Sequence, residues 1–153
     1  MENSIVVLQI KELLTEENMI AALANVSACI MSNYPNLNWA GFYFSTDKDL
    51  VLGPFQGKVA CTHIPFGKGV CGRTYRENAM QRVDDVHKVQ DHIACDSASQ
   101  SELCVPVIID NKCKIMIDLD APITNRFTEI EKKEMLAVAS LIQEAYYQHH
   151  WSI

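Results

Sequence analysis

Hydrophobic residues recur in parts of this chain every three or four positions, the spacing that places them on one face of a helix. This spacing predicts two helices, with these core-facing residues: Met19, Leu23, Val26 and Ile30 in the first, and Met135, Val138, Ala139, Ile142 and Tyr146 in the second. We expect Thr15 to cap the first helix and residues 33–36, Asn-Tyr-Pro-Asn, to end it. Thr128 and Glu131 form a capping-box sequence before the second helix.

Between these helices, short apolar runs bounded by turn residues predict strands. The expected strands are 38–44, 50–52, 58–64, 81–83, 103–109 and 114–119, with a short helix over 70–76. We expect Gly53-Pro54 and Gly57 to form turns, and Asp110-Asn111 to close a hairpin. Residues 84–101 are polar and aperiodic, which predicts a long loop of the functional kind.

The order of these elements predicts an α/β fold of the α+β type. Strands follow one another without long helices between them, which favours a central antiparallel sheet flanked by the N- and C-terminal helices. We expect residues 1–153 to form a single domain, with the first ten or so residues as an N-terminal extension.

Composition and charge narrow the possible functions. The chain of 153 residues is 48% hydrophobic and 21% charged, an ordinary globular composition that argues against disorder. Its net charge of -6 disfavours nucleic acid as a partner. Because the sequence lacks a long apolar run and a basic leader, we expect no membrane association and a cytoplasmic location.

Six cysteines then need an explanation, because cytosolic thiols are kept reduced and rarely form a structural disulfide framework. Cys71 follows a glycine-rich turn, Gly67-Lys68-Gly69, at the start of the short helix. Such a turn can offer N–H groups to an anion, and the helix dipole can lower the pKa of a thiol in the first turn. The alternative is a tight loop with the Cys71 side chain turned inward, and this is the commoner structure for a short Gly-x-Gly sequence.

A second candidate is Cys95, within the loop segment 92–96. We expect it to be exposed there, with His92 lowering its pKa and Asp96 raising it. Taken alone, a loop cysteine is incidental more often than catalytic.

The third candidate is a set of carboxylates in strands: Glu102, Asp118 and Asp120. Asp118 and Asp120 are two positions apart, so they face the same side of one strand. Like-charge repulsion and desolvation should raise at least one pKa in the set. The alternative is a solvated strand face or a turn.

A zinc site is a further possibility. Cys61-x-His63 and His92-x-x-Cys95 could together supply four ligands. The spacing between the two pairs matches no common zinc module, so we expect no metal.

Five stretches, taken in order, resemble one family. They are Asn-Trp-Ala-Gly-Phe-Tyr at 38–43, Leu-Gly-Pro-Phe-Gln-Gly-Lys at 52–58, Phe-Gly-Lys-Gly-Val-Cys-Gly at 66–72, His-Ile-Ala-Cys-Asp at 92–96 and Asp-Leu-Asp at 118–120. These stretches are similar to the free methionine-R-sulfoxide reductases, which are GAF-domain enzymes. The resemblance covers nearly the whole chain and implies a GAF fold and an oxidoreductase that needs no cofactor.

The resemblance also implies roles for three cysteines: Cys61, Cys71 and Cys95. The thiolate matching Cys95 attacks the sulfoxide sulfur and is left as a sulfenic acid. Cys61 or Cys71 then condenses with it to a disulfide, which a thioredoxin-type reductant opens. The order of these partners stays open at this point.

The remaining family matches lie around the substrate. Glu102, Asp118 and Asp120 match the polar residues that hold the sulfoxide oxygen and the ammonium group of free methionine sulfoxide. Trp39 and Tyr43 match the aromatic wall against its methyl group. The other cysteines, Cys29, Cys104 and Cys113, match no family role and are interpreted as packing residues.

The competing interpretation is a GAF sensor that binds a small ligand without turnover. Such modules share the fold, but they do not need three cysteines in this arrangement and usually occur fused to an output domain. We also expect a homodimer, because the terminal helices are apolar enough to allow one.

Overall fold

Four α-helices and six strands make up the part of the chain described by the computed structural model, residues 4–93 and 95–153. In chain order they are α1 (Ile5–Leu13), α2 (Met19–Asn33), β1 (Trp39–Ser45), β2 (Leu50–Gly57), β3 (His63–Ile64), α3 (Gly69–Glu77), β4 (Gln81–Val83), a 3-10 turn (Val86–Lys88), β5 (Ser101–Ile109), β6 (Lys112–Ala121) and α4 (Glu129–Gln148). The strands pair in the order β3-β2-β1-β6-β5-β4, and all five pairings are antiparallel.

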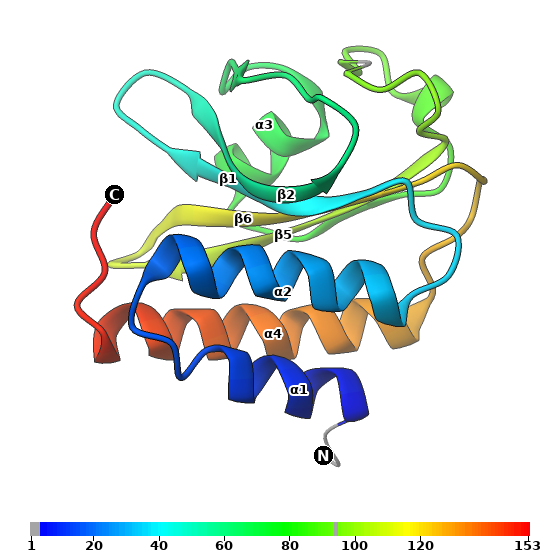
Figure 1. The fold of residues 1–153 in the computed structure, drawn as a ribbon. Helices are drawn as coiled ribbons and strands as arrows, with labels where there is room; N and C mark the ends of the chain where they lie inside the picture. The colour runs from blue at the N-terminus through cyan, green and yellow to red at the C-terminus, as the bar shows by residue number, and fades with distance from the viewer. Residues whose placement is uncertain (1–3, 94) are drawn as a thin grey trace.

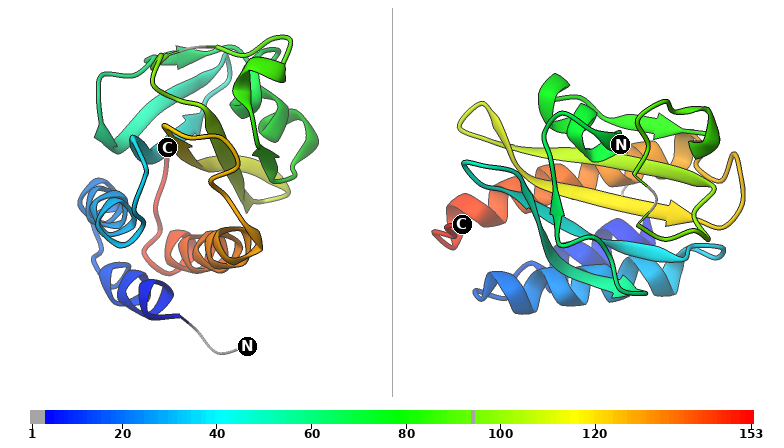
Figure 2. Two further views of the ribbon diagram at one scale, coloured as in Figure 1. Left: turned by 90° about the vertical axis from the view of Figure 1, so that its right-hand side faces the viewer. Right: turned by 90° about the horizontal axis from the view of Figure 1, so that it is seen from above.

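The helices divide unequally between the two faces of the sheet. Helices α2 and α4 lie against one face, with α1 packed outside them, and α3 lies over the opposite face (Figure 1). Figure 2 shows the same layering from two other directions. The predicted antiparallel sheet flanked by terminal helices is therefore present. None of the described helices combines the length and apolar character that a membrane crossing requires.

Strand β1 is buried throughout because it runs between these two layers. Ala40, Phe42 and Phe44 belong to the core under the helices, whereas Trp39 and Tyr43 belong to a smaller cluster on the α3 side. Successive side chains of a strand point to opposite faces, so this alternation gives the α3 side its own set of residues.

The first predicted helix begins later than expected. Asn18 caps α2, and its side chain accepts a hydrogen bond from the N–H of the third helical residue. The cap assigned to Thr15 was wrong: its hydroxyl donates to the Glu12 carbonyl at the end of α1, a helix that sequence periodicity did not reveal. The capping box of Thr128 before α4 is confirmed.

The predicted turn at Gly53 and Pro54 was also wrong. Strand β2 continues through both residues, and the register of β1 against β2 shifts there, so the pair lies opposite Phe42 alone. Glycine and proline are tolerated in a strand at a β-bulge. The expected strand over 58–64 shrinks to His63–Ile64.

The hairpin and the long loop follow the sequence more closely. Asp110 and Asn111 both have positive φ, 51° and 67°, as a two-residue hairpin turn between β5 and β6 requires. Among residues 84–93 and 95–100, the short 3-10 turn is the one regular element. This loop passes over the α3 side of the sheet, where the candidate site lies.

Candidate active site

Strand pairing gathers the predicted acids into two adjacent rows on the α3 face of the sheet. In the first row Glu102 on β5 lies opposite Asp120 on β6, which in turn lies opposite Trp39 on β1. In the next row Cys104 lies opposite Asp118. Because each strand places alternate residues on this face, the register converts residues distant in sequence into neighbours.

A pocket lies above these rows, between the sheet, α3 and the long loop. Its lining consists of Trp39, Tyr43, Ala60, Ile64, Gly69, Val70, Cys71, His92, Ile93, Cys95, Asp96, Ser99, Glu102, Asp118 and Asp120. The pocket thus contains seven of the eight site residues predicted from sequence, and the eighth, Cys61, is bonded to one of them.

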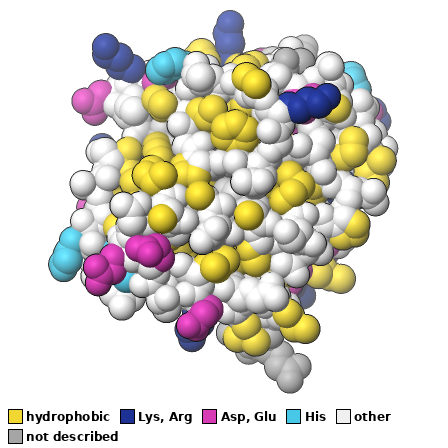
Figure 3. Space-filling view, viewed as in Figure 1, with side chains coloured by type: hydrophobic (Ala, Val, Ile, Leu, Met, Phe, Trp, Pro, Cys, Tyr) yellow, Lys and Arg dark blue, Asp and Glu magenta, His cyan; other side chains and the backbone are white. Residues whose placement is uncertain are grey.

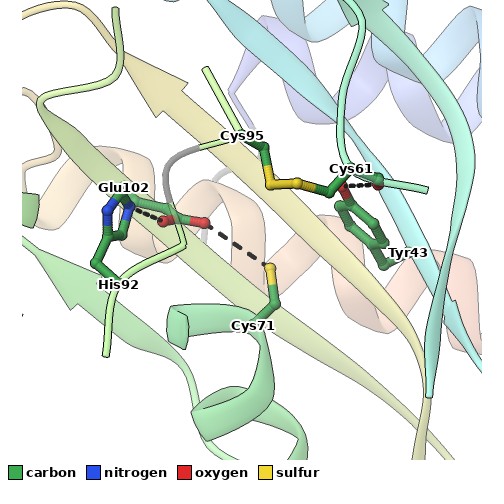
Figure 4. The surroundings of a disulfide bond; sticks show 6 residues. All are labelled: Tyr43, Cys61, Cys71, His92, Cys95 and Glu102. Carbon is green, nitrogen blue, oxygen red and sulfur yellow. Dashed lines mark hydrogen bonds and ion pairs between the residues drawn. A yellow bond between two sulfur atoms is a disulfide. The ribbon is translucent and has the colours of Figure 1, made fainter. Parts of the chain in front are cut away.

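Cys61 and Cys95 form a disulfide at the edge of this pocket (Figure 4). Their Cα atoms are 5.4 Å apart although the residues are separated by 34 positions. Both are half-buried. The Tyr43 hydroxyl donates a 2.8 Å hydrogen bond to the Cys61 carbonyl, so this side chain fixes the segment that carries Cys61 as well as lining the pocket.

The long loop that carries Cys95 is tied down at two further points. The Asn38 side-chain amide donates 3.0 Å hydrogen bonds to Asp96 Oδ2 and to Ser99 Oγ. At the other end, the Gly69 N–H donates to the Asp91 carbonyl at 3.1 Å. Gly69 has a φ of 74°, a conformation that strains other residues.

These bonds correct one interpretation of the glycine-rich turn. One of the two interpretations of this turn made its N–H groups available to an anion. The Gly69 N–H is instead donated to the loop, and the Lys68 N–H is donated to the Pro65 carbonyl at 3.3 Å. The turn therefore seats the loop on α3.

Cys71 is buried under the pocket, 4% exposed. Its Sγ lies 3.5 Å from Cys104 Sγ and donates a 3.8 Å hydrogen bond to Glu102. The hydrogen bond with Cys104 favours the Cys71 thiolate, but desolvation and the charge of Asp118 outweigh it and raise the pKa of Cys71 to about 11. The possible lowering of this pKa by the helix dipole does not occur, and the inward-facing interpretation, the commoner one for such a turn, is confirmed.

The carboxylate cluster behaves as its crowding predicts. Burial, followed by the charges of Asp118 and Asp120, raises the pKa of Glu102 well above its usual range. Burial also raises the pKa of Asp118, and burial with the charge of Asp118 raises that of Asp120. The solvated alternative was wrong. The raised pKa values favour the protonated form of a carboxyl group inside the pocket.

His92 does not interact with Cys95 in the way expected. Its Nε2 faces Glu102, 3.9 Å from Oε1, as the dashed line in Figure 4 marks. Desolvation is the main cause that lowers the pKa of His92. The imidazole therefore lies next to the acid cluster, where it can exchange a proton with Glu102.

Comparison with known proteins fits this geometry. No protein-family model matches the chain. The free methionine-R-sulfoxide reductase of Escherichia coli (strain K12) is 42% identical over 129 residues, which are 84% of this chain and 78% of that protein. The chain belongs to the free methionine-R-sulfoxide reductase family.

Solved structures place this family member in the GAF fold. The free methionine-R-sulfoxide reductase of Neisseria meningitidis, solved in complex with its substrate, has a TM-score of 0.91 and 35% identity, covering 95% of this chain and 88% of that one. A solved GAF domain has a TM-score of 0.87 and 38% identity, covering 92% and 84%. The predicted fold class and family are confirmed.

The zinc ligands weighed from the sequence do not converge in this reductase. Cys61 and Cys95 are joined to each other, His63 Nδ1 lies 2.9 Å from Asp49 Oδ2, and His92 faces Glu102. Another set of ligand-type atoms does lie together. One atom each from four residues falls within 4.8 Å of the others: Cys71, Glu102, Cys104 and Asp118. This spacing would let all four contact one ion.

Sequence reasoning missed two residues of this site, Cys104 and Asn38. Cys104 is two positions after Glu102 on β5, so the alternation that joined Asp118 to Asp120 would have placed it on the same face. For Asn38 the sequence carried no such signal, because its partners lie about sixty positions away.

Proposed function

We propose that this protein reduces free methionine-R-sulfoxide to methionine, with Cys95 as the nucleophile and Cys61 as its first disulfide partner. The observation that carries this assignment is the Cys61–Cys95 disulfide at the mouth of a pocket lined by Glu102 and two aspartates. It combines an oxidisable thiol pair with an acid whose raised pKa favours the protonated form.

The chemistry balances with the groups present. The Cys95 thiolate attacks the sulfoxide sulfur while the protonated Glu102 carboxyl donates its proton to the oxygen. The hydroxyl group then passes from the substrate sulfur to the Cys95 sulfur, the bond between the two sulfur atoms breaks, and methionine leaves with Cys95 as a sulfenic acid. The Cys61 thiol then attacks that sulfur, the hydroxyl leaves as water, and the disulfide forms. Two electrons pass from two thiols to one sulfoxide.

The pocket also has groups for the rest of the substrate. Asp118 and Asp120 supply negative charge for an ammonium group, and the aromatic faces of Trp39 and Tyr43 supply an apolar wall. The Trp39 Nε1–H is buried without an acceptor among the described residues. Since a buried donor without a partner is costly, we assign it to a substrate oxygen.

We further propose that a thioredoxin-type dithiol recycles the enzyme in the cytoplasm. Both disulfide cysteines are half-buried rather than enclosed, which leaves a sulfur open to attack by an external thiolate. A reducing compartment also suits the four remaining cysteines, which the structure contains in free form: Cys29, Cys71, Cys104 and Cys113.

A homodimer through the helical layer completes the proposal. Ile5 and Leu8 on α1 are 73% and 52% exposed, and Ile130 on α4 is 66% exposed. Figure 3 shows hydrophobic side chains at the lower edge of this face, where Figure 1 places α1. Burying these side chains between two copies would remove apolar surface from water.

Single-turnover measurements test the assignment of Cys95. Reduced Cys95→Ser should release no methionine from free methionine-R-sulfoxide, because a hydroxyl cannot replace the thiolate. Cys61→Ser should still release methionine in the first turnover, and dimedone present during the reaction should label Cys95. Cys29→Ser, a cysteine of α2 remote from the pocket, is the matched control. If Cys95→Ser still releases methionine, Cys95 is not the nucleophile, and if the wild type releases none, the protein is a sensor.

A further inference from the structure

Cys104 is a second buried thiol beside the pocket, and the proposed reaction does not use it. It is fully buried on β5, directly beneath Cys71 of α3. The two sulfur atoms lie 3.5 Å apart although the residues are separated by 33 positions. A disulfide needs an S–S distance of about 2.0 Å, so a movement of roughly 1.5 Å would join them.

We infer that Cys71 and Cys104 form a second redox pair, which holds two further electrons and can reduce the Cys61–Cys95 disulfide from inside the protein. This inference rests on the proposed function. It gives Cys104 a role that the packing interpretation does not, and it provides for two turnovers before an external reductant is needed.

The internal exchange balances. The Cys71 thiolate attacks the Cys95 sulfur, the Cys61–Cys95 bond breaks, and Cys61 leaves as a thiolate that takes up a proton. The Cys104 thiolate then attacks the Cys71 sulfur and releases Cys95. Two thiols are oxidised and one disulfide is reduced. A second sulfoxide molecule, the oxidant of the second turnover, then reacts with Cys95 and leaves the protein with two disulfides.

Figure 4 shows why Cys71 is suited to start this exchange. Its sulfur points from α3 toward the pocket, on whose edge the disulfide lies, and Cys71 and Cys95 both line that pocket. Cys104 lies behind it against the sheet, out of reach of substrate. The geometry therefore orders the two thiols, with Cys71 as the attacking group and Cys104 as the group that resolves it.

The neighbouring carboxyls provide a place for the protons. Cys104 Sγ lies 3.2 Å from Asp118 Oδ1 and 3.3 Å from Glu102 Oε2, and Cys71 Sγ lies 3.8 Å from the same Glu102 oxygen. Glu102 gives up a proton to the sulfoxide oxygen in the first turnover. As a carboxylate it can take the proton of either thiol, which both forms the attacking thiolate and restores the acid for the next sulfoxide.

Cys113 provides a matched comparison. It is also buried, 1% exposed, and belongs to the same apolar cluster. Its Sγ donates a 3.4 Å hydrogen bond to the Ile115 carbonyl and has no hydrogen-bonding contact with Cys71 among the described residues. Cys104→Ser and Cys113→Ser make the same chemical change at two buried positions. Only Cys104→Ser should change the number of disulfides that form per chain.

The test is the stoichiometry of the fully reduced, anaerobic wild-type protein with excess free methionine-R-sulfoxide and no reductant. Samples are quenched in acid, the free thiols are alkylated, and the disulfides are mapped by mass spectrometry. We expect two methionines per chain, four thiols lost, and linked peptides joining Cys61 to Cys95 and Cys71 to Cys104. One methionine with the Cys61–Cys95 link alone would overturn the second pair while leaving the proposed function intact. No methionine would overturn the proposed function itself.

Variants separate a redox role from packing. Cys104→Ser should stop at one methionine and one disulfide per chain, because no thiol is left to release Cys95 from Cys71 for a second turnover. Cys113→Ser should still form both disulfides. If Cys104→Ser forms a second disulfide, or if the wild type links Cys71 only to Cys61 or Cys95, Cys104 is not the partner. The wild-type mapping decides the question even where the serine variant folds poorly.

Discussion

Reducing the Cys61–Cys95 bond should lower the free energy of unfolding by about 4 kcal/mol. The bond joins residues separated by 34 positions. Cross-linking removes loop-closure entropy from the unfolded chain, and for a loop of about 34 residues this loss is about 4 kcal/mol at 25 °C. In a chain of this length a change of that size shifts the midpoint of thermal unfolding by roughly 10 °C.

Urea titration of two samples measures this difference. One sample is kept reduced with a phosphine, and the other is oxidised with one equivalent of free methionine-R-sulfoxide, which supplies oxidant for one disulfide per chain. The size of this stability difference does not identify which cysteines are paired, so variants are needed. A Cys71–Cys95 bond would close a loop of about 24 residues and stabilise the chain by about 3.5 kcal/mol, nearly the same amount.

Cys71→Ser should therefore preserve the difference between the two samples, and the double variant Cys61→Ser/Cys71→Ser should abolish it. The opposite result would show that the first disulfide in solution is not the one seen in the structure. Equal stability of the oxidised and reduced wild type would refute the reasoning altogether, because a native bond across this loop must restrict the unfolded chain.

Two further predictions concern the acid and the loop. Glu102→Gln should lower activity ~10²- to 10⁴-fold by removing the acid. It should also raise the free energy of unfolding at pH 7, because an amide does not have to take up a proton on folding. The raised pKa of Glu102 means that the folded protein holds this proton more tightly than the unfolded chain does. The free energy of unfolding of the wild type should therefore fall as pH rises from about 4.5 through the Glu102 pKa. Urea titrations at several pH values should show a shallower dependence on pH for the variant. Asn38→Ala should slow formation of the Cys61–Cys95 disulfide in quench-flow, because it frees the loop from β1, while Thr62→Ala, an exposed change beside Cys61, should not.

Much of the local structure was determined by short-range sequence. The capping box of Thr128, the helical spacing in α4 and the Asp110-Asn111 hairpin each depend on residues within a few positions of one another, so their outcome could be predicted. The same holds for Asp118 and Asp120, whose common face follows from the period of a strand. The family motifs added the identity of the redox cysteines, which periodicity alone did not supply.

Only the tertiary structure decided the features that depend on register and on contacts between distant segments. Gly53 and Pro54 have the composition of a turn, yet pairing with β1 makes them a bulge. Which cysteine joins Cys95 depends on where the loop over 84–100 is seated by Asn38 and Gly69. Burial, which reverses the expected effect of a helix terminus on Cys71, arises only when α3 packs on the sheet. Side chains on one strand or helix are placed by local geometry, whereas the distance between two sulfur atoms depends on how the whole sheet is assembled.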